Sequence, residues 1–165
     1  MTMFLEFVIL SAVPAFVLTL PDGAPASACS DQVPQHKGTA PQGGAPPYII
    51  AATQAGYGPG TVIGLSIYSP ERETFKGFFI QAFDTTSNTP VGSFGCHLQD
   101  VTCSEEPLHF YPQCSAATHS SSRDRSATNL LWSAPNTGSG QVFFKATILK
   151  NYSTYWTGVT SQTIQ

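Results

Sequence analysis

The sequence feature that most constrains the fold is the apolar stretch FKGFFIQA at residues 75–82. Successive side chains of a β-strand point to opposite faces, so Phe79 would lie on one face and Phe78 and Ile80 on the other. Gly77 has no side chain to pack, which indicates a bulge or a close approach by a neighbouring backbone. With large apolar groups on both faces, the stretch predicts a central strand that is covered on both sides.

The composition excludes two classes of partner. The chain of 165 residues has a formal net charge of -3 and only 10% charged residues, so it lacks the basic surface of a nucleic-acid-binding protein. No basic amphipathic segment favours binding to an anionic membrane surface. The 13 prolines and 14 glycines predict short strands joined by many turns, and the length supports one domain.

The N-terminal apolar run at residues 4–20 predicts a secretory signal peptide. Glu6 and Pro14 interrupt the run, which is short for a membrane span, and no Lys or Arg precedes it. We expect the signal peptide to cover residues 1–19; an uncleaved anchor or a core strand is the alternative. Three cleavage points fit the sequence, after Val17, Thr19 or Ala28. No other stretch is long and apolar enough to cross a bilayer, so the mature chain is expected to be secreted and extracellular, without a membrane span.

Four cysteines follow this run: Cys29, Cys96, Cys103 and Cys114. An even number of cysteines in a small exported chain predicts two disulfides, with three possible pairings. A zinc site that also uses His97, His109 or His119 is the alternative. The spacings lack a Cys-x-x-Cys pair, and the expected compartment oxidises thiols. We therefore expect disulfides and no metal.

Two further features concern the surface. The N-x-[ST] match at residues 151–153 makes Asn151 a candidate glycosylation site if it is exposed. Tyr57 and Tyr111 lie in or near turns and are the better candidates for an exposed aromatic platform that binds glycans. Packing in the core or at an edge is the more common role of tyrosines.

Beyond the signal peptide, the chain divides into an irregular arm and a series of short strands. Residues 20–47 are rich in Pro, Gly, Ala and Ser and lack a usable period, so we expect an irregular arm there and the folded domain at 48–165. Apolar runs and alternation predict strands at 48–52, 61–68, 75–82, 91–94, 108–111, 127–132, 141–149 and 155–161. About seven to nine strands without an amphipathic helix predict an all-β antiparallel sandwich or barrel, in which Trp132 could fill the space between sheets.

No catalytic constellation stands out. The four histidines are scattered, and the nucleophile elbow Gly-x-Ser-x-Gly is absent. Glu105 and Glu106 are followed by Pro107, which favours a solvated turn over an acid–base pair. Asp84 and Asp100 lie in polar loops without the spacing of a calcium loop. We therefore expect a protein that is not an enzyme and has no cofactor.

Short motifs spread along the whole chain occur in a distinctive order. They are GAP at 23–25, AC at 28–29, VPQH at 33–36, Gln42, PY at 47–48, PG at 59–60, FKGFFIQA at 75–82, VGSF at 91–94, Cys114, THS at 118–120, WSAP at 132–135, VFFKAT at 142–147 and YW at 155–156. In number, order and spacing they resemble a reeler (reelin N-terminal) domain. The resemblance runs from about Gly23 to Ile164.

The resemblance implies an immunoglobulin-like β-sandwich. It also implies that Cys29 pairs with Cys114, which would join the arm to the sandwich and leave Cys96 to pair with Cys103. The single-domain secreted members resemble the insect defence proteins, which are implicated in antibacterial immunity and in binding to microbial surfaces. The family offers no catalytic residues to carry over.

These observations lead to a main hypothesis and two rivals. The main hypothesis is a secreted innate-immune protein that binds microbial surfaces in an antimicrobial response, without catalysis. The first rival is an extracellular interaction module of a larger reeler-containing protein, such as a ferric-chelate-reductase-like membrane protein or the matrix protein reelin. The second, a metal or haem carrier, rests only on the residue types of His36, His97 and His119. The expected partners are microbial surface polymers or extracellular proteins; the sequence assigns no ligand-binding residues and no oligomeric state.

Overall fold

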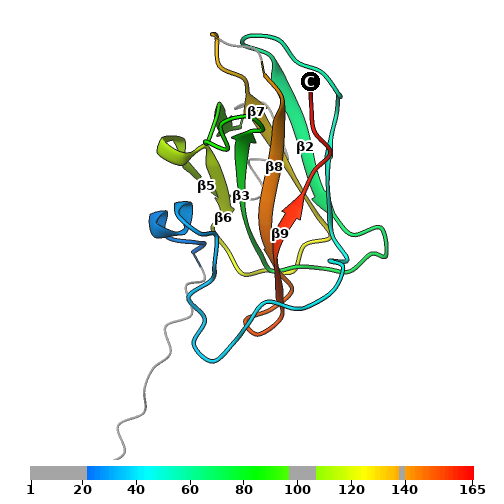
Figure 1. Ribbon diagram of the computed structural model, residues 1–165. Helices are drawn as coiled ribbons and strands as arrows, with labels where there is room; N and C mark the ends of the chain where they lie inside the picture. Colours follow the sequence, from blue (N-terminus) through cyan, green and yellow to red (C-terminus); the bar gives the residue numbers. More distant parts are fainter. Residues whose placement is uncertain (1–21, 97–106, 138–139) are drawn as a thin grey trace, which may run out of the picture.

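The computed structural model describes residues 22–96, 107–137 and 140–165. Over these ranges the chain forms two antiparallel sheets that pack face to face (Figure 1). The four-stranded sheet has the order β1 (Ile49–Ala52), β2 (Val62–Tyr68), β7 (Ala127–Ser133), β4 (Ser93–Gly95). The five-stranded sheet has the order β5 (Leu108–Tyr111), β6 (Ala116–His119), β3 (Gly77–Asp84), β8 (Val142–Leu149), β9 (Tyr155–Thr160). The prediction of an all-β antiparallel sandwich is confirmed.

Strand β3 is the centre of the five-stranded sheet, as the stretch at residues 75–82 predicted. It pairs with β6 on one side and with β8 on the other, and its first six residues are buried. Phe78 and Ile80 have no exposed surface and belong to the core between the sheets. Phe79 is 3% exposed and belongs to a second apolar cluster on the opposite face. Both faces of β3 are therefore covered.

Trp132 of β7 anchors the core between the two sheets. It has no exposed surface, and its register partners are Ile63 of β2 and Phe94 of β4. Its ring meets the ring of Phe144 edge-on, with centroids 5.5 Å apart. Its indole N–H donates to the carbonyl of Val91 over 3.0 Å, so the polar atom of this large side chain is satisfied. The role that the sequence suggested for Trp132 is the one it has.

Two details differ from the sequence-based expectation. Strand β6 was not among the strands predicted from the sequence; its four residues, AATH, include no large aliphatic side chain, yet all four are buried beside β3. Gly77 marks neither a bulge nor a close backbone approach, since β3 and β8 pair without a shift at this residue. A Cβ at Gly77 would lie 2.7 Å from Cε1 of the His119 ring, so the glycine makes room for a side chain.

An irregular arm at residues 22–47 precedes the sandwich and includes one short 3-10 helix, η1 (Ala26–Cys29). It runs along the five-stranded sheet in Figure 1, where it is drawn in blue and cyan. A second 3-10 helix, η2 (Pro112–Cys114), joins β5 to β6. The predicted signal peptide at 1–19 lies outside the described residues, as does the segment 97–106. That segment holds several residues considered above: His97, Asp100, Cys103, Glu105 and Glu106.

Truncation of the core anchor should strongly destabilise the fold. We expect Trp132→Ala to lower the free energy of unfolding by about 3–5 kcal/mol, because the deletion leaves a cavity between the sheets. Urea unfolding followed by circular dichroism measures this change. The control is Val62→Ala, at a side chain that is 42% exposed, where a change below about 0.5 kcal/mol is expected. Equal effects of the two substitutions would contradict the assignment of Trp132 as the anchor.

Candidate functional site

The arm is fastened to the five-stranded sheet at its N-terminal part by a disulfide and by hydrogen bonds. Cys29 of η1 is bonded to Cys114 of η2, 85 positions further along the chain. The amide of Ala24 donates to the hydroxyl of Thr118 over 3.2 Å, and the hydroxyl of Tyr111 donates to the carbonyl of Ala24 over 2.7 Å. These contacts hold the beginning of the arm over β5 and β6.

Gly23 shows how closely the arm approaches the sheet. A Cβ at this position would lie 1.9 Å from the carbonyl oxygen of His119, and the residue has a φ of +96°. Any other residue here would clash with the His119 carbonyl and would have to adopt an unfavourable backbone conformation. The arm therefore enters its position over β6 at a glycine.

Gln32 ties the middle of the arm to β3 and β8 through hydrogen bonds that are buried. Its Nε2 donates to Oε1 of Gln81 over 2.6 Å, and Nε2 of Gln81 donates in turn to the carbonyl of Cys114 over 2.9 Å. The hydroxyl of Thr147 donates to the carbonyl of Gln32 over 2.6 Å. Gln32 holds a positive φ of 59°, is 4% exposed, and its Oε1 has no hydrogen-bond partner among the described residues. An unpaired buried acceptor costs about 1–3 kcal/mol.

The end of the arm is held by the β8–β9 turn. The ring of His36 stacks on the ring of Tyr152, with centroids 4.2 Å apart, and its Nδ1 lies 2.6 Å from the Tyr152 carbonyl oxygen. Further along, the amide of Gln42 donates to the carbonyl of Tyr155 over 2.8 Å. The arm is thus fixed at three successive places along the sheet.

A pocket of about 600 Å³ remains between the arm and the sheet. Its sheet side is formed by Phe78 and Phe79 of β3, His119 of β6, and Thr147 and Leu149 of β8, with Tyr152 at the β8–β9 turn. Its arm side is formed by residues between 23 and 37, which include small ones at the start, such as Gly23, Ala24 and Ser27, and longer ones at the end, such as Gln35 and Lys37. This volume lies within the range of small-molecule sites in proteins, about 300–1,000 Å³. The pocket is the candidate functional site.

His119 is the buried titratable group of this pocket. Its Nδ1 lies 3.1 Å from the amide nitrogen of Phe78 and 3.0 Å from the Phe78 carbonyl oxygen, so the ring accepts from the first or donates to the second according to its tautomer. Burial lowers the pKa of the His119 imidazole below its ordinary value of 6.5; the hydrogen bond with Phe78 opposes the shift, and the charges of Arg125 and His109 add to it. The ring is therefore neutral at pH 7 and acts as a hydrogen-bonding part of the wall.

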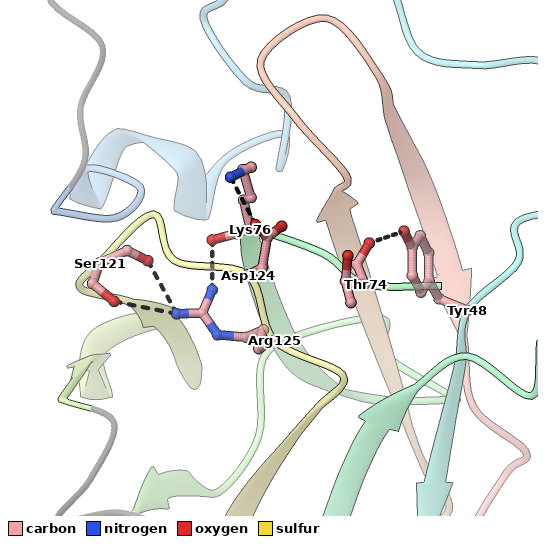
Figure 2. Close-up of polar contacts among 6 residues, drawn as sticks. All are labelled: Tyr48, Thr74, Lys76, Ser121, Asp124 and Arg125. Carbon is pink, nitrogen blue, oxygen red and sulfur yellow. Dashed lines mark hydrogen bonds and ion pairs between the residues drawn. The ribbon is translucent and has the colours of Figure 1, made fainter. Parts of the chain in front are cut away.

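A second polar cluster lies near the start of β3, where its side chains hydrogen-bond to backbone carbonyls of the adjoining segments (Figure 2). The guanidinium of Arg125, 5% exposed, donates to the carbonyls of Lys76 and Ser121 and lies over the Phe75 ring. Its hydrogen bonds hold the β6–β7 loop against β3. Tyr48 donates to the Thr74 carbonyl over 2.9 Å, and burial, together with the charge of Glu73, raises the pKa of its phenol to about 12. Both groups act as structural hydrogen-bond donors.

The candidate residues from the sequence are distributed as follows. The bridge Cys29–Cys114 that the resemblance implies is present, whereas Cys103 lies outside the described residues and the bridge Cys96–Cys103 stays a prediction. Asn151 is half-buried in the β8–β9 turn, where its Oδ1 accepts from the amides of Ser153 and Thr154. Glycosylation of Asn151 stays a prediction.

Tyr57 and Tyr111 do not form an exposed platform. The ring of Tyr57 packs edge-on against Trp132, with centroids 5.5 Å apart. Tyr111 is half-buried, and its hydroxyl holds the arm. Among the described residues, no group of three or more His, Cys, Asp or Glu side chains could hold a metal ion, and no helix is long and apolar enough to span a membrane.

The sequence assigned no ligand-binding residues and gave Phe78 and Phe79, which line the pocket, only a role in the buried strand. Sequence reasoning also missed Gln32, Thr147 and Leu149. Two features of the sequence could have indicated this pocket: the apolar residues on both faces of β3 and the small residues of the arm.

A solved structure shows the same architecture. The human F-spondin reeler domain superposes with a TM-score of 0.63 over 82% of this chain and 98% of its own, at 22% sequence identity. Two stacked antiparallel sheets preceded by an arm thus define an immunoglobulin-like β-sandwich of the reeler type. The chain belongs to the Reeler domain family, which it matches over residues 27–165.

The relatives fall into two groups. The "Putative defense protein" of Bombyx mori is 33% identical over 87% of this chain and 83% of its own length, and the "Putative defense protein 1" of Antheraea mylitta is 31% identical over 95% and 94%. The "Putative ferric-chelate reductase 1" of Danio rerio is 27% identical over 97% of this chain. This chain spans only 27% of that reductase-named protein.

Removal of the bridge should loosen the arm. We expect Cys29→Ala/Cys114→Ala to lower the free energy of unfolding by about 4 kcal/mol in the chain-entropy account of a long loop. Limited proteolysis, read by mass spectrometry, should show new cleavage first within residues 22–47. Reductant provides the control. It should expose the arm of the wild type to cleavage but leave the arm cleavage of the double variant unchanged. Wild-type protection of the arm in the variant would contradict the role of the bridge.

The buried His119 should make stability depend on pH. The unfolded imidazole takes up its proton near 6.5 and the folded one only at lower pH, so the stabilisation is complete above 6.5 and is lost as the pH falls. In His119→Gln, which keeps a side-chain acceptor for the Phe78 amide, the slope of unfolding free energy against pH should be lower by up to about 1.4 kcal/mol per pH unit. Urea unfolding at a series of pH values measures this slope.

The matched control is His109→Gln, at an exposed residue of the neighbouring strand β5. Because the charge of His109 contributes to the lowered pKa of His119, this variant should reduce the slope less than His119→Gln does. A variant at His119 with the full wild-type slope would show that another group causes the pH dependence.

Proposed function

We propose that the chain is an extracellular defence protein that binds microbial surfaces and acts without catalysis. The observation that carries this proposal is the near full-length similarity to proteins named as defence proteins. The aligned region covers 83% of the length of one of these relatives and 94% of another. The similarity therefore extends over nearly the whole of these relatives and is not confined to one module of a larger protein.

The disulfide supports the extracellular part of the proposal. Bridges such as Cys29–Cys114 persist in oxidising compartments and are rare in the cytosol. We include in the proposal the signal peptide at residues 1–19, the arm at 20–47, the sandwich at 48–165, the bridge Cys96–Cys103 and a glycan on Asn151. The glycan would be attached through the amide nitrogen of Asn151, whereas the side-chain oxygen already accepts hydrogen bonds from the turn.

The chemistry of the pocket supports binding rather than catalysis. The amides of Gln32 and Gln81 and the hydroxyl of Thr147 make hydrogen bonds that hold the arm to the sheet. A general base needs a nucleophile or a substrate proton within reach, and the Nδ1 of His119 is within hydrogen-bond distance of the Phe78 backbone. Binding of a ligand requires none of these groups to change its protonation.

The second candidate function is that of an interaction module within a larger protein. The similarity to a reductase-named protein of Danio rerio, of which this chain spans 27%, favours it. A transcript whose reading frame continues past Gln165 into a further domain would decide for this alternative.

Binding to whole cells tests the proposed function. The purified secreted chain, fluorescently labelled, is incubated with bacterial and yeast cells, which are then pelleted and washed. We expect saturable retention, and an excess of unlabelled chain should reduce the retained signal about ten-fold or more, as for competition at a specific site. Retention that excess chain does not reduce, or no retention on any cell type, would refute the proposal.

A further inference from the structure

The outer face of the four-stranded sheet carries no charged side chain. In β2 and β7 every second residue is buried, so the residues between them point away from the core. The outward residues of β1, β2, β7 and β4 are Ile, Val, Leu and Tyr once each, and otherwise Ala, Gly, Ser and Asn. Charged residues are among those that most often occupy an exposed surface. A sheet face without them offers no counter-ion to a charged partner and suits a neutral one.

Apolar side chains lie at both ends of this face. Ile49 of β1 and Val62 of β2 are 39% and 42% exposed. In the described part of the chain only Val33, on the arm, is a further large apolar side chain exposed to this degree. Tyr68 is the register partner of Ile49 and extends that apolar end across β2. The arm runs along the other sheet (Figure 1), so it does not shield these side chains.

The centre of the face is polar but uncharged. Ser66 of β2 lies in register between Ala51 of β1 and Asn129 of β7. Within the described residues, the hydroxyl of Ser66 and the side-chain amide of Asn129 make no hydrogen bond. Each of these groups can both donate and accept. The face therefore presents hydrogen-bonding groups between two apolar ends.

A shallow depression lies beside Leu131. In the sheet register Leu131 of β7 stands between Gly64 of β2 and Gly95 of β4. A Cβ at Gly95 would meet no heavy atom within 4 Å beyond its chain neighbours, so the space on this side of Leu131 is open. The half-buried Leu131 side chain thus borders the depression with apolar surface.

The size of the face indicates the kind of partner. Four strands about 4.8 Å apart and at most seven residues long, at about 3.3 Å per residue, span about 400 Å². A stable protein–protein interface covers about 800 Å² on each partner. The face is therefore too small to hold a second folded chain by itself, whereas a narrow polymer can lie across it.

We propose that the outer face of the four-stranded sheet binds a neutral polysaccharide of the microbial cell wall. A sugar ring has apolar C–H faces and carries hydroxyl groups around its edge. The C–H faces pack on Tyr68 and on Leu131 beside Gly95, and the hydroxyl groups bond to Ser66 and Asn129. This inference rests on the proposed function and adds to it the binding surface and the class of ligand.

Binding to isolated polymers tests the ligand class. The probes are mannan and laminarin, two neutral polysaccharides, and lipoteichoic acid, whose phosphates are anionic. Each polymer is immobilised, and binding of the purified chain is measured by biolayer interferometry. We expect saturable binding to at least one neutral polymer, with an affinity at least ten-fold higher than for lipoteichoic acid. No binding to either neutral polymer, or an equal affinity for the anionic one, would overturn the inference.

Substitutions locate the binding face. Asn129→Lys places a longer, charged side chain at the centre of the face, where a bound polymer would have to desolvate it. Gly95→Ile fills the depression beside Leu131 with a residue that favours strands. The matched control is Gln141→Lys, which adds the same charged side chain at an exposed residue next to β8 of the other sheet. Circular dichroism and the urea midpoint show that each variant is folded.

We expect both face variants to lose at least ten-fold in affinity for the neutral polymer, and Gln141→Lys to bind as the wild type does. Wild-type affinity in either folded face variant would overturn the location of the site. Size-exclusion chromatography with light scattering gives a second check. A dimeric wild type with a monomeric Asn129→Lys variant would overturn the inference and assign the face to a second copy of the chain.

Retention on cells separates this inference from the proposed function. We expect an excess of the soluble neutral polymer to reduce retention of the wild type on cells about ten-fold. Retention that neither the polymer nor Asn129→Lys reduces would overturn this inference and leave the proposed function standing. Absence of retention on every cell type would refute the proposed function, whereas binding to the isolated polymers would still decide the ligand class.

Discussion

The structure depends on covering the outer face of the five-stranded sheet. Its central strand β3 presents Phe79 to that face beside Gln81, and without a cover the apolar ring of Phe79 would be exposed to water. The arm provides the cover, and it has no regular hydrogen-bond ladder of its own to hold it there. A covalent bridge and the paired amides of Gln32 and Gln81 replace the ladder. The sandwich thus has a third layer, made of irregular chain.

The strands were predictable because their signals are local. Alternation in β2 places Ile63, Leu65 and Ile67 on one face, and all three are buried. The two-sided apolar pattern of β3 also predicted that something must lie on its second face. It could not say what, because residues 20–47 have no period, and the path of an irregular segment is determined by long-range contacts. Strand β6 was missed for a related reason: its small residues are buried by their neighbours and carry no pattern of their own.

The candidate site was the least predictable part. Gln32, Phe79, Thr147 and Leu149 come from three distant segments and form no motif. The role of Gln32 arises from a left-handed backbone conformation and from a partner 49 positions away. The bridge Cys29–Cys114 was accessible only through resemblance to a family, since four cysteines alone allow three pairings. Spatial proximity, and not residue type, makes these side chains a site.

The attachment of the arm has a consequence for the order of events during synthesis. The arm is made before the sandwich, yet its partners, from Tyr111 and Cys114 to Thr147 and Tyr155, all leave the ribosome much later. Domains whose contacts join distant parts of the chain complete them slowly. The thiol of Cys29 must therefore wait until the strands beneath it have assembled. The native bridge therefore closes late, after Cys114 has been made 85 positions further on, and until then hydrogen bonds alone can hold the arm.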